Sequence, residues 1–261
     1  MMHALWVSKT GLEAQDLNLS TVSNNLSNVS TVGFKKDRAV FEDLLYQIQR
    51  QPGSNSSADT RLPSGLQLGT GVRTAGTQKI FTTGSLELTD QPLDLAINGR
   101  GFFQIQMPDG TVSYTRNGTF HINDEGTIVN VNGYPLEPQI DIPELTSNLT
   151  ISKDGIVQAT MFGDPVPQEL GQIETVDFIN PAGLQAVGGN LYFETVASGA
   201  PIVGVPSEEG FGTMEQGALE NSNVEVVEEL VKMITVQRAY EMNSKVVSAA
   251  DKMLQFLVQT V

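Results

Sequence analysis

Residues 222–261 read SNVEVVEELVKMITVQRAYEMNSKVVSAADKMLQFLVQTV, a stretch with neither glycine nor proline. Ser222 and Glu225 have the spacing of a capping box, in which side chains satisfy the free N–H groups at a helix start. Glu228 and Glu229 follow in the first turns, where the helix dipole favours negative charge. The stretch therefore predicts one helix of about 38 residues, which is about 55 Å at 1.5 Å per residue.

Apolar residues recur every seven positions along this predicted helix. They are Val226, Met233, Tyr240, Val247, Leu254 and Val261. Leu230 takes an intermediate position of the same seam, and Ile234 widens its apolar face. An apolar seam of this length requires a partner helix.

A second heptad pattern lies in the N-terminal residues. Its members are Leu5, Leu12, Leu19 and Leu26, with Val22 and Val29 three residues after the last two. Gly33 can take the left-handed conformation that closes a helix, which sets the predicted N-terminal helix at residues 1–33. The two helices either form an intramolecular hairpin on a globular core or belong to a coiled coil that assembles many copies.

We predict that the heptad residues of both helices pack between subunits. The predicted subunit-packing residues are Leu5, Leu12, Leu19, Val22, Leu26, Val29, Val226, Leu230, Met233, Ile234, Tyr240, Val247 and Leu254. Asn24, Asn25 and Asn28 are poor helix formers at the end of the first helix. They lie either on a solvated face or in hydrogen bonds between packed helices, where one polar residue can set the register.

The composition limits the class of protein. The chain has 261 residues, 39% of them apolar, so it can bury a large core in one domain or two. It has no run of eighteen apolar residues, so we expect no membrane insertion. Its first residues include Glu13 and Asp16 and lack a continuous apolar block, so we expect no cleaved signal peptide. Because cysteine is absent, disulfides and thiolate metal sites are excluded.

The negative charge is concentrated in the middle of the chain. Residues 1–35 carry two basic and two acidic groups, and residues 221–261 carry four basic and five acidic groups. Since the whole chain has a formal net charge of −15, residues 36–220 hold −14 of it. An acidic segment repels nucleic acid and anionic membranes, so neither is an expected partner.

Residues 34–70 are predicted to form an extended linker. Phe34 to Ile48 has apolar residues at mixed helical spacing, which predicts an ordered, helix-like stretch. Residues 51–65 read QPGSNSSADTRLPSG, and this polar composition with several breakers predicts an irregular loop.

Residues 71–220 carry the signals of a β-rich domain. Turn dipeptides occur there at nearly even intervals, at Asp109-Gly110, Asn117-Gly118, Glu125-Gly126 and Asn132-Gly133. Asp-Gly and Asn-Gly are strong hairpin signals, so the short runs between them predict an antiparallel meander in a small barrel or sandwich. The predicted fold class is α+β, with long N- and C-terminal helices forming a coiled coil, the second over residues 221–261, and an inserted, mainly antiparallel β domain.

The sequence offers little for catalysis or metal binding. His3 and His121 are the two histidines, and neither has a second histidine or a cysteine at ligand spacing. The glycines of residues 65–71 and 98–102 fit neither a P-loop nor a dinucleotide fingerprint. We therefore predict no catalytic residue, no metal and no cofactor. An acidic cleft with a glycosidase-like carboxylate pair is the enzyme alternative, and a periplasmic binding module with a helical stalk is another.

Several motifs resemble those of one protein family. Residues 23–35, SNNLSNVSTVGFK, resemble the N-terminal signature of bacterial flagellar rod and hook proteins, with Val32 where many members have proline or asparagine. Residues 222–245 resemble the C-terminal signature, and residues 94–103 with residues 114–118 resemble the shared middle motif. Residues 38–47, followed by Gln-Pro-Gly at 51–53, are more similar to the distal rod members than to the hook or proximal rod members.

This resemblance implies a structural role. Copies would assemble helically into the hollow drive shaft that crosses the periplasm in the basal body and transmits torque to the hook. The implied partners are copies of the chain, proximal rod proteins, the hook protein and the ring bushing of the periplasm and outer membrane. The type III export apparatus would deliver the chain unfolded, without a cleaved signal. A proximal rod or hook-type subunit is the alternative within the family. The implied rod-specific contacts between subunits are Tyr46, Pro52, Gly53 and Pro63.

Overall fold

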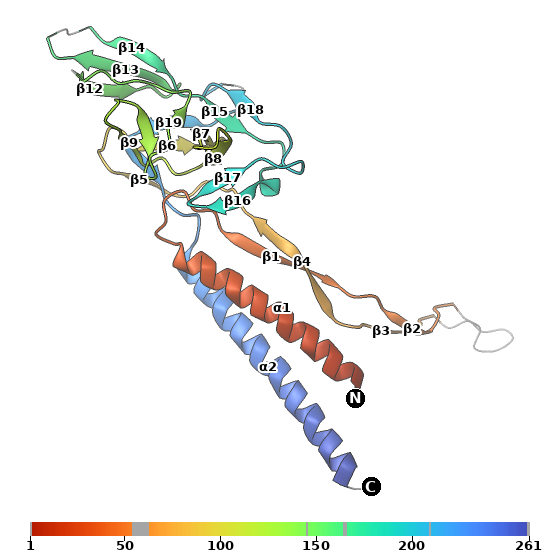
Figure 1. Ribbon diagram of the computed structural model, residues 1–261. Helices are drawn as coiled ribbons and strands as arrows, with labels where there is room; N and C mark the ends of the chain where they lie inside the picture. Colours follow the sequence, from red (N-terminus) through yellow and green to blue (C-terminus); the bar gives the residue numbers. More distant parts are fainter. Residues whose placement is uncertain (1, 54–62, 145, 164–165, 209, 260–261) are drawn as a thin grey trace. The chain divides into compact units, whose positions relative to one another are not determined.

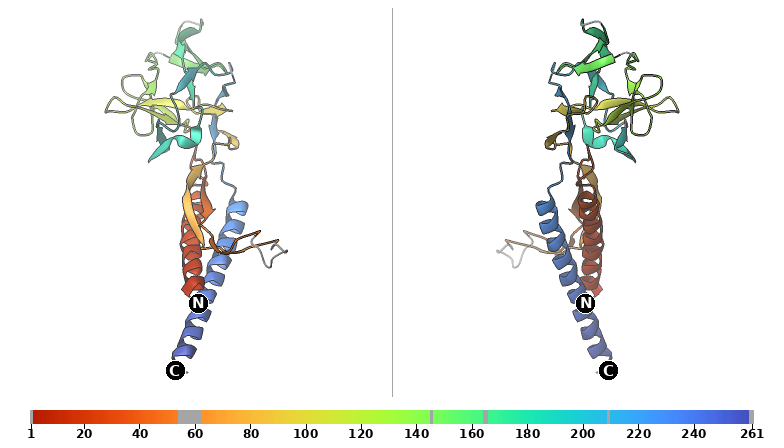
Figure 2. Two further views of the ribbon diagram at one scale, coloured as in Figure 1. Left: turned by 90° about the vertical axis from the view of Figure 1, so that its right-hand side faces the viewer. Right: turned by 90° about the vertical axis from the view of Figure 1, so that its left-hand side faces the viewer.

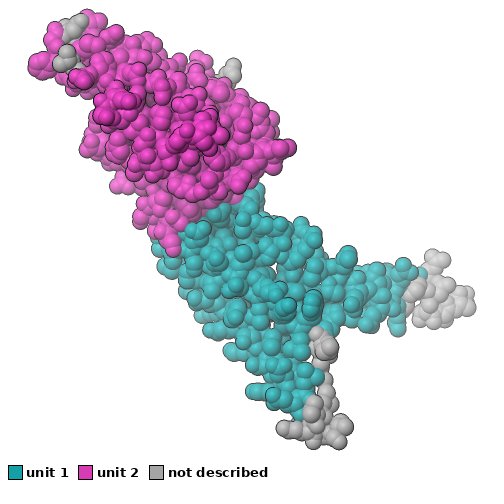
Figure 3. Space-filling view, viewed as in Figure 1, with its two compact units in different colours: residues 1–26, 37–78, 225–261 teal, residues 27–36, 79–224 magenta. Residues whose placement is uncertain are grey.

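The chain divides into two compact units (Figure 3). The computed structural model describes residues 2–53, 63–144, 146–163, 166–208 and 210–259. Unit 1 comprises residues 1–26, 37–78 and 225–261, and unit 2 comprises residues 27–36 and 79–224. Each unit is therefore built from segments that are far apart in the sequence.

Unit 1 contains two long helices that run side by side in opposite directions (Figures 1 and 2). Helix α1 spans Met2–Ser27 and helix α2 spans Val226–Gln259. The Asn25 amide donates a hydrogen bond to Glu229 Oε2 at 3.3 Å. A Cβ on Gly11 would lie 3.0 Å from Asn243 Nδ2. These two contacts are fourteen residues apart on both helices, which fixes the antiparallel register over about 21 Å.

Both helices are shorter than the sequence predicts. The hydroxyl oxygen of Ser222 accepts a hydrogen bond from the Val224 N–H, so Ser222 closes a local turn and the predicted capping box is wrong. The first helical residue is instead Val226. At the other end, α1 gives way after Ser27 to turns in which Asn28 O accepts from the Thr31 N–H. Asparagine and serine favour such turns over helix.

The rest of unit 1 is a β-ribbon, so the helix-like stretch predicted for residues 34–48 is wrong, whereas the described residues of the predicted loop, 51–53 and 63–65, lie outside any helix or strand. Strand β1 (Asp37–Asp43) pairs with β4 (Val72–Lys79), and β2 (Gln47–Arg50) pairs with β3 (Leu66–Leu68). The valine and aromatic residues that gave a mixed helical spacing are also good strand formers, and pairing across the ribbon decides between the two. Part of the predicted irregular loop, residues 54–62, lies outside the described residues.

The ribbon touches α1 at two places. The Asn25 side chain accepts a hydrogen bond from the Asp37 N–H at 2.9 Å and donates one to the Asp37 carbonyl at 2.8 Å. Farther along, the Val72 N–H donates to Thr10 Oγ1 at 3.4 Å. A Cβ at Gly71 would lie 2.2 Å from that hydroxyl oxygen, so only glycine allows this approach.

Unit 2 is mainly antiparallel β structure. Its strands are β5 (Leu86–Leu88), β6 (Leu95–Asn98), β7 (Phe103–Gln106), β8 (Val112–Thr115), β9 (Phe120–Ile122), β10 (Ile128–Asn130), β11 (Leu136–Glu137), β12 (Thr146–Ile151), β13 (Ile156–Met161), β14 (Gln168–Gln172), β15 (Thr175–Asp177), β16 (Gln185–Gly188), β17 (Leu191–Phe193), β18 (Ile202–Gly204), β19 (Thr213–Gln216) and β20 (Ala218–Glu220). A short 3-10 helix, η1, spans Pro181–Gly183. The largest sheet has the order β11-β7-β8-β17-β16 and a second has the order β12-β13-β14. Two-stranded pairs such as β19-β6 and β20-β5 complete the unit.

The predicted turn signals are confirmed at most positions. Gly110 and Gly126 have φ of 81° and 86° and close the hairpins β7–β8 and β9–β10. Gly133 also has a positive φ, in the turn after β10. The prediction for Asn117-Gly118 is wrong, because strand β8 pairs with β7 and β17 and not with β9. Gly118 packs against the backbone of Leu95, where a Cβ would lie 1.6 Å from the carbonyl oxygen.

Two apolar clusters form the core of unit 2. The larger holds aliphatic and aromatic residues of the strands, among them Leu95, Ile97, Phe103, Ile105, Phe120, Leu136, Val157 and Ile173. The smaller is aromatic, and Phe102, Phe178, Tyr114 and Tyr192 pack edge to face in it. Such burial is the main favourable term in folding.

Substitution of Gly33 tests how closely the N-terminal segment approaches the β unit. Gly33 has a φ of 70°, and a Cβ there would lie 2.6 Å from the Asn117 backbone nitrogen. Gly33→Ala should lower the free energy of unfolding by about 2–5 kcal/mol, through left-handed strain and overpacking. Gly110→Ala, which has the same handedness and open space around it, should cost only about 1–2 kcal/mol. Urea unfolding of both variants measures the difference, and equal losses would contradict it.

Candidate functional site

Glu220 lies at the centre of a buried ion triad in unit 2. Its Oε1 accepts hydrogen bonds from Lys35 Nζ at 2.6 Å and from the Gly84 N–H at 2.8 Å. Its Oε2 accepts from Arg116 Nη1 at 3.3 Å. The three side chains Lys35, Arg116 and Glu220 are all at least 97% buried. One carboxylate therefore balances two cations away from water.

Lys35 Nζ and the two terminal nitrogens of Arg116 also bind backbone carbonyls, whereas Arg116 Nε is buried without a hydrogen-bond partner among the described residues. Lys35 Nζ donates to Thr82 O at 2.7 Å, and Arg116 donates to Ile97 O at 3.0 Å and to Gly99 O. Burial lowers the pKa of Lys35, and Glu220 opposes this shift. Burial likewise lowers the pKa of Arg116, again against the attraction of Glu220. The charged forms of both cations thus depend on the carboxylate.

The triad joins segments that are distant in sequence. The Glu220 carbonyl accepts from the Gly33 N–H at 2.7 Å, and strand β20 pairs with β5 with Glu220 opposite Leu86. Asn223 continues the same junction: its Oδ1 accepts from the Lys36 N–H at 2.8 Å, and its amide donates to Ile80 O. The chain entering unit 2 and the chain leaving it are therefore held together by charge and hydrogen bonds.

The most buried residues of α2 are not the predicted packing residues. The residues of α2 that are buried against α1 are small or polar for the most part: Glu229, Val236 and Ala250, with Asn243 partly buried. Val226, Leu230, Ile234 and Tyr240 are exposed, and Met233, Val247 and Leu254 are half-buried. The apolar heptad residues thus lie beside the seam or face away from it.

Helix α1 shows the same arrangement. Its buried residues are Ser8, Ala14, Thr21, Val22 and Asn25. Of the predicted packing residues only Val22 is buried, whereas Leu5, Leu12, Leu19 and Leu26 are half-buried, as is Val29 in the turn after the helix. In the ribbon, Tyr46, Pro52, Gly53 and Pro63 are all exposed.

Asn25 has the second of the two roles considered for the asparagines. Its side chain bonds the Asp37 backbone and Glu229, whose Oε1 also accepts from Lys232 Nζ at 2.9 Å. The amide therefore joins α1, α2 and the start of the ribbon. The prediction of a hydrogen bond between packed helices is confirmed for this residue.

Sequence reasoning missed Lys35, Arg116 and Glu220 as a group. Lys35 and Arg116 stand inside motifs that carry the family resemblance and Glu220 lies two residues before another, but no spacing signals that the three converge. A lysine in a polar run such as Lys35-Lys36-Asp37 is ordinarily a surface residue. The three residues meet only because strand β20 pairs with β5, which brings Glu220 beside Leu86 and the Gly84 N–H.

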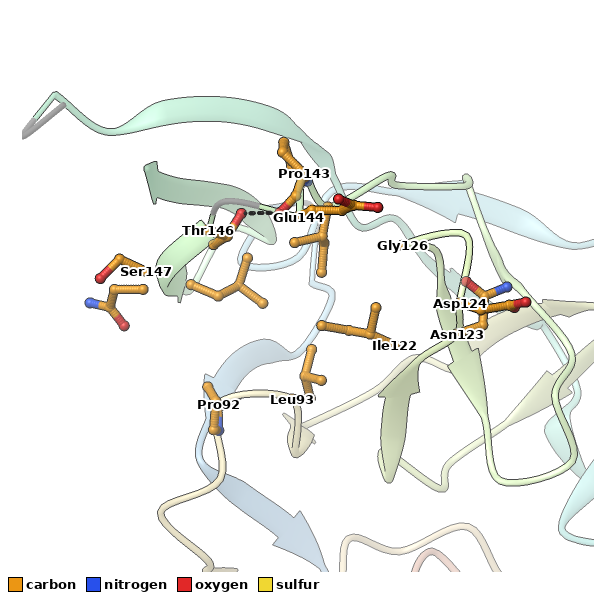
Figure 4. Close-up of a pocket in the computed structure, with 13 residues that line it drawn as sticks. Pro92, Leu93, Ile122, Asn123, Asp124, Gly126, Pro143, Glu144, Thr146 and Ser147 are labelled. Carbon is orange, nitrogen blue, oxygen red and sulfur yellow. Dashed lines mark hydrogen bonds between the residues drawn. The ribbon is translucent and has the colours of Figure 1, made fainter. Parts of the chain in front are cut away.

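Unit 2 also has a shallow pocket (Figure 4). Pro92, Leu93 and Ile122 line its apolar side, and Thr146 donates a hydrogen bond to Pro143 O at 2.7 Å on the other. Its two carboxylates, Asp124 and Glu144, are exposed, so neither has the burial that tunes a catalytic acid. Over the described ranges no group of three His, Asp or Glu could hold a metal ion. None of the described helices is long and apolar enough to cross a membrane.

Three parts of the chain match known families. Residues 5–35 match "Flagella basal body rod protein", and residues 96–159 match "Flagellar hook protein FlgE/F/G D1 domain". Residues 215–260 match "Flagellar basal body rod FlgEFG protein C-terminal". The matched parts include both terminal helices and the centre of unit 2.

Relatives match over nearly the whole chain. The flagellar basal-body rod protein FlgG of Buchnera aphidicola subsp. Schizaphis graminum is 54% identical over 99% of this chain and 100% of its own length. FlgG of Caulobacter vibrioides is 49% identical over 97% of each chain, and FlgG of Bacillus subtilis is 36% identical over 99% of this chain and 98% of its own. The solved structure of Helicobacter pylori flagellar hook protein FlgE2 aligns at 16% identity over 71% of this chain and 43% of its own, but its TM-score of 0.26 supports no conclusion.

These matches place the chain among the structural proteins of the bacterial flagellum. Within that class it belongs to the flagellar basal-body rod protein family. Its relatives are structural rod proteins, and the chain is a component of the basal-body rod and not an enzyme.

Removal of the Glu220 charge tests the triad. Glu220→Gln leaves two buried cations without a counter-charge, so it should lower the free energy of unfolding by about 3–5 kcal/mol. Glu87→Gln is the matched control, because Glu87 lies on the neighbouring strand and faces solvent, where its carboxylate accepts from Asn221. It should change stability by less than about 0.5 kcal/mol. Denaturant unfolding followed by circular dichroism compares them, and similar losses would show that the triad contributes little.

Proposed function

We propose that the chain is a subunit of the distal rod that assembles helically into a hollow shaft and transmits torque to the hook. Membership of the basal-body rod family supports a place in the rod, and the resemblance of residues 38–53 to distal members supports the finer assignment. A proximal rod or hook-type subunit is the alternative. The observation that carries self-assembly is the burial pattern of α2.

Helix α2 exposes a stripe of large apolar residues on the side opposite its buried Glu229, Val236 and Ala250. The outer α2 stripe consists of Val227, Val231, Ile234, Arg238, Met242 and Lys245, which are all exposed. They recur at steps of three and four, so they share one side of the helix. Val236, on the side toward α1, is only 5% exposed, whereas Ile234 is 51% exposed. A long stripe of exposed apolar residues is typical of an interaction surface.

The β-ribbon is a second surface that we expect neighbouring subunits to cover. Leu45 is 89% exposed, and Ile48 and Leu66 are also exposed. A two-stranded ribbon is marginally stable by itself in water, and its open edges invite further pairing or packing. We propose that Tyr46, Pro52, Gly53 and Pro63 contact neighbouring subunits and make the shaft stiff. Contacts with proximal rod proteins, the hook protein, the ring bushing and the type III export apparatus complete the proposed set of partners.

Charge placed on the outer α2 stripe should separate assembly from folding. Ile234→Asp puts a carboxylate at an exposed position, so the free chain should keep its helix content and its stability to within about 0.5 kcal/mol. Assembly should be lost, because the carboxylate would be buried unpaired between copies. Val236→Asp is the matched control: it buries the charge inside the chain and should unfold the helix pair. Circular dichroism measures the fold, and sedimentation with electron microscopy measures assembly. If Ile234→Asp formed normal rods, the outer α2 stripe would not be a contact surface between subunits.

A shortened ribbon tests the stiffness proposal. The Leu44 N–H donates to Gly71 O at 2.9 Å, and Thr70 Oγ1 donates to Leu45 O at 2.6 Å. These two hydrogen bonds join the two strands of the ribbon between the β1–β4 pair and the β2–β3 pair, so they do not depend on β2 and β3. Replacing residues 47–68 by an Asn-Gly turn should therefore leave β1 and β4 paired. Rods should still form but should be more curved in electron micrographs, because the outer contacts are gone. Rods as straight as those of the parent chain would contradict the proposal.

A further inference from the structure

Helix α1 also exposes a continuous stripe on the side away from α2. The outer α1 stripe consists of Trp6, Lys9, Glu13, Asp16 and Ser20, which are all exposed. Their steps of three and four place them on one face. Trp6 is two residues from the buried Ser8, a rotation of about 200°, so it projects away from the helix pair. The helix α2 of the same chain therefore cannot cover this stripe.

Trp6 is the apolar end of the outer α1 stripe. It is the sole tryptophan of the chain and is 58% exposed. It lines a groove between α1 and the ribbon with Leu5, His3, Lys9, Gln47 and Thr70. Tryptophan is the residue most enriched at the energetic centre of interfaces, where it fills an apolar pocket. An exposed tryptophan in a groove thus identifies a docking surface.

We propose that the outer α1 stripe of one copy binds the outer α2 stripe of a second copy, with the two helices parallel. This inference rests on the proposed self-assembly and names the surfaces that meet. The order of residues along the two stripes carries it. In α1 the apolar Trp6 comes first, Lys9 follows, and the acidic Glu13 and Asp16 come after it. In α2 the apolar Val227, Val231 and Ile234 come first and the basic Arg238 and Lys245 follow.

The two stripes match in spacing as well as in chemistry. Glu13 lies seven residues after Trp6, and Arg238 lies seven residues after Val231. With Trp6 beside Val231, a parallel arrangement brings Glu13 beside Arg238. An antiparallel arrangement would instead place the carboxylate of Glu13 among the valines, at a desolvation cost. Charge complementarity of this kind chiefly fixes orientation and register.

A contact between different faces of identical chains is heterologous, and it closes into a ring only when its rotation divides a full turn. The surface used on one copy is free on the next, so with any other rotation the contact repeats and generates an open helical filament. The ion pairs of the free chain do not compete strongly, since Lys9 and Glu13 are 3.5 Å apart on an exposed surface. The inference therefore accounts for growth in one direction from a single pair of helix faces.

Reversal of the charges in the full-length chain tests the inference. Trp6 fluorescence of the wild type should shift to shorter wavelength on assembly, because docking removes the indole from water. Glu13→Lys alone and Arg238→Glu alone should each lose both assembly and the shift. An equal mixture of the two variants should recover both, because every outer α1 stripe then meets an opposite charge when the copies alternate. Glu87→Lys, outside both stripes, should behave as the wild type, and circular dichroism confirms that each variant keeps its helices.

The outcomes separate the inference from the proposed function. Wild-type assembly without a fluorescence shift, or single reversals that assemble with the shift intact, would overturn the pairing of stripes and leave self-assembly standing. Failure of the mixture to recover assembly would also overturn the pairing. Failure of the wild type to assemble at all would overturn the proposed function and this inference together.

Discussion

The carboxylate of Glu220 is the interaction on which the β-rich unit depends. It neutralises Lys35 and Arg116 in a region that water does not reach, and it holds the Gly84 N–H as well. A buried charge is stable only with its partner, so the three residues must be present together or not at all. The segments that carry them come from the start, the middle and the end of the sequence. The unit is thus closed by electrostatics at its entry and exit, while apolar packing fills its interior.

The amphipathic pattern of the terminal helices has a meaning that a single chain does not reveal. Heptad spacing correctly predicted two long helices, but their most buried residues are mainly small or polar, such as Ser8, Ala14 and Ala250, with the two valines Val22 and Val236, whereas the leucines of α1 are only half-buried. Small residues at the contact let the two helices approach closely, so this contact buries little of the large apolar side chains. Large apolar residues such as Val227, Val231 and Ile234 remain exposed, and the proposed association of copies would remove them from water. Sequence periodicity identified the residues but could not say which helix they would meet.

In the β structure, features set by local sequence were predicted correctly, whereas features set by distant residues were not. Gly110, Gly126 and Gly133 adopt the conformations that their turn dipeptides require, because these signals are local. Asn117-Gly118 has the same local signal, yet its glycine serves a close approach to Leu95. The helix-like stretch predicted for residues 34–48 is wrong, because valine and aromatic residues are good strand formers and the partner strands β4 and β3 decide the structure. The ion triad and the Asn25 contacts depend on pairings up to 204 residues apart, which no local pattern encodes.

The two contacts between the ribbon and α1 have a mechanical consequence. Asn25 holds the ribbon at Asp37, and Thr10 holds it at Val72, across the strand pair β1–β4. The fifteen steps of helix from Thr10 to Asn25 measure about 23 Å and the six steps of strand from Asp37 to Asp43 about 20 Å, so the two elements span similar lengths. Helix α1 and the ribbon are therefore two roughly parallel elements that are joined near both ends. A sideways force on the ribbon therefore stretches one of these elements and compresses the other. A single contact would instead let the ribbon rotate about it.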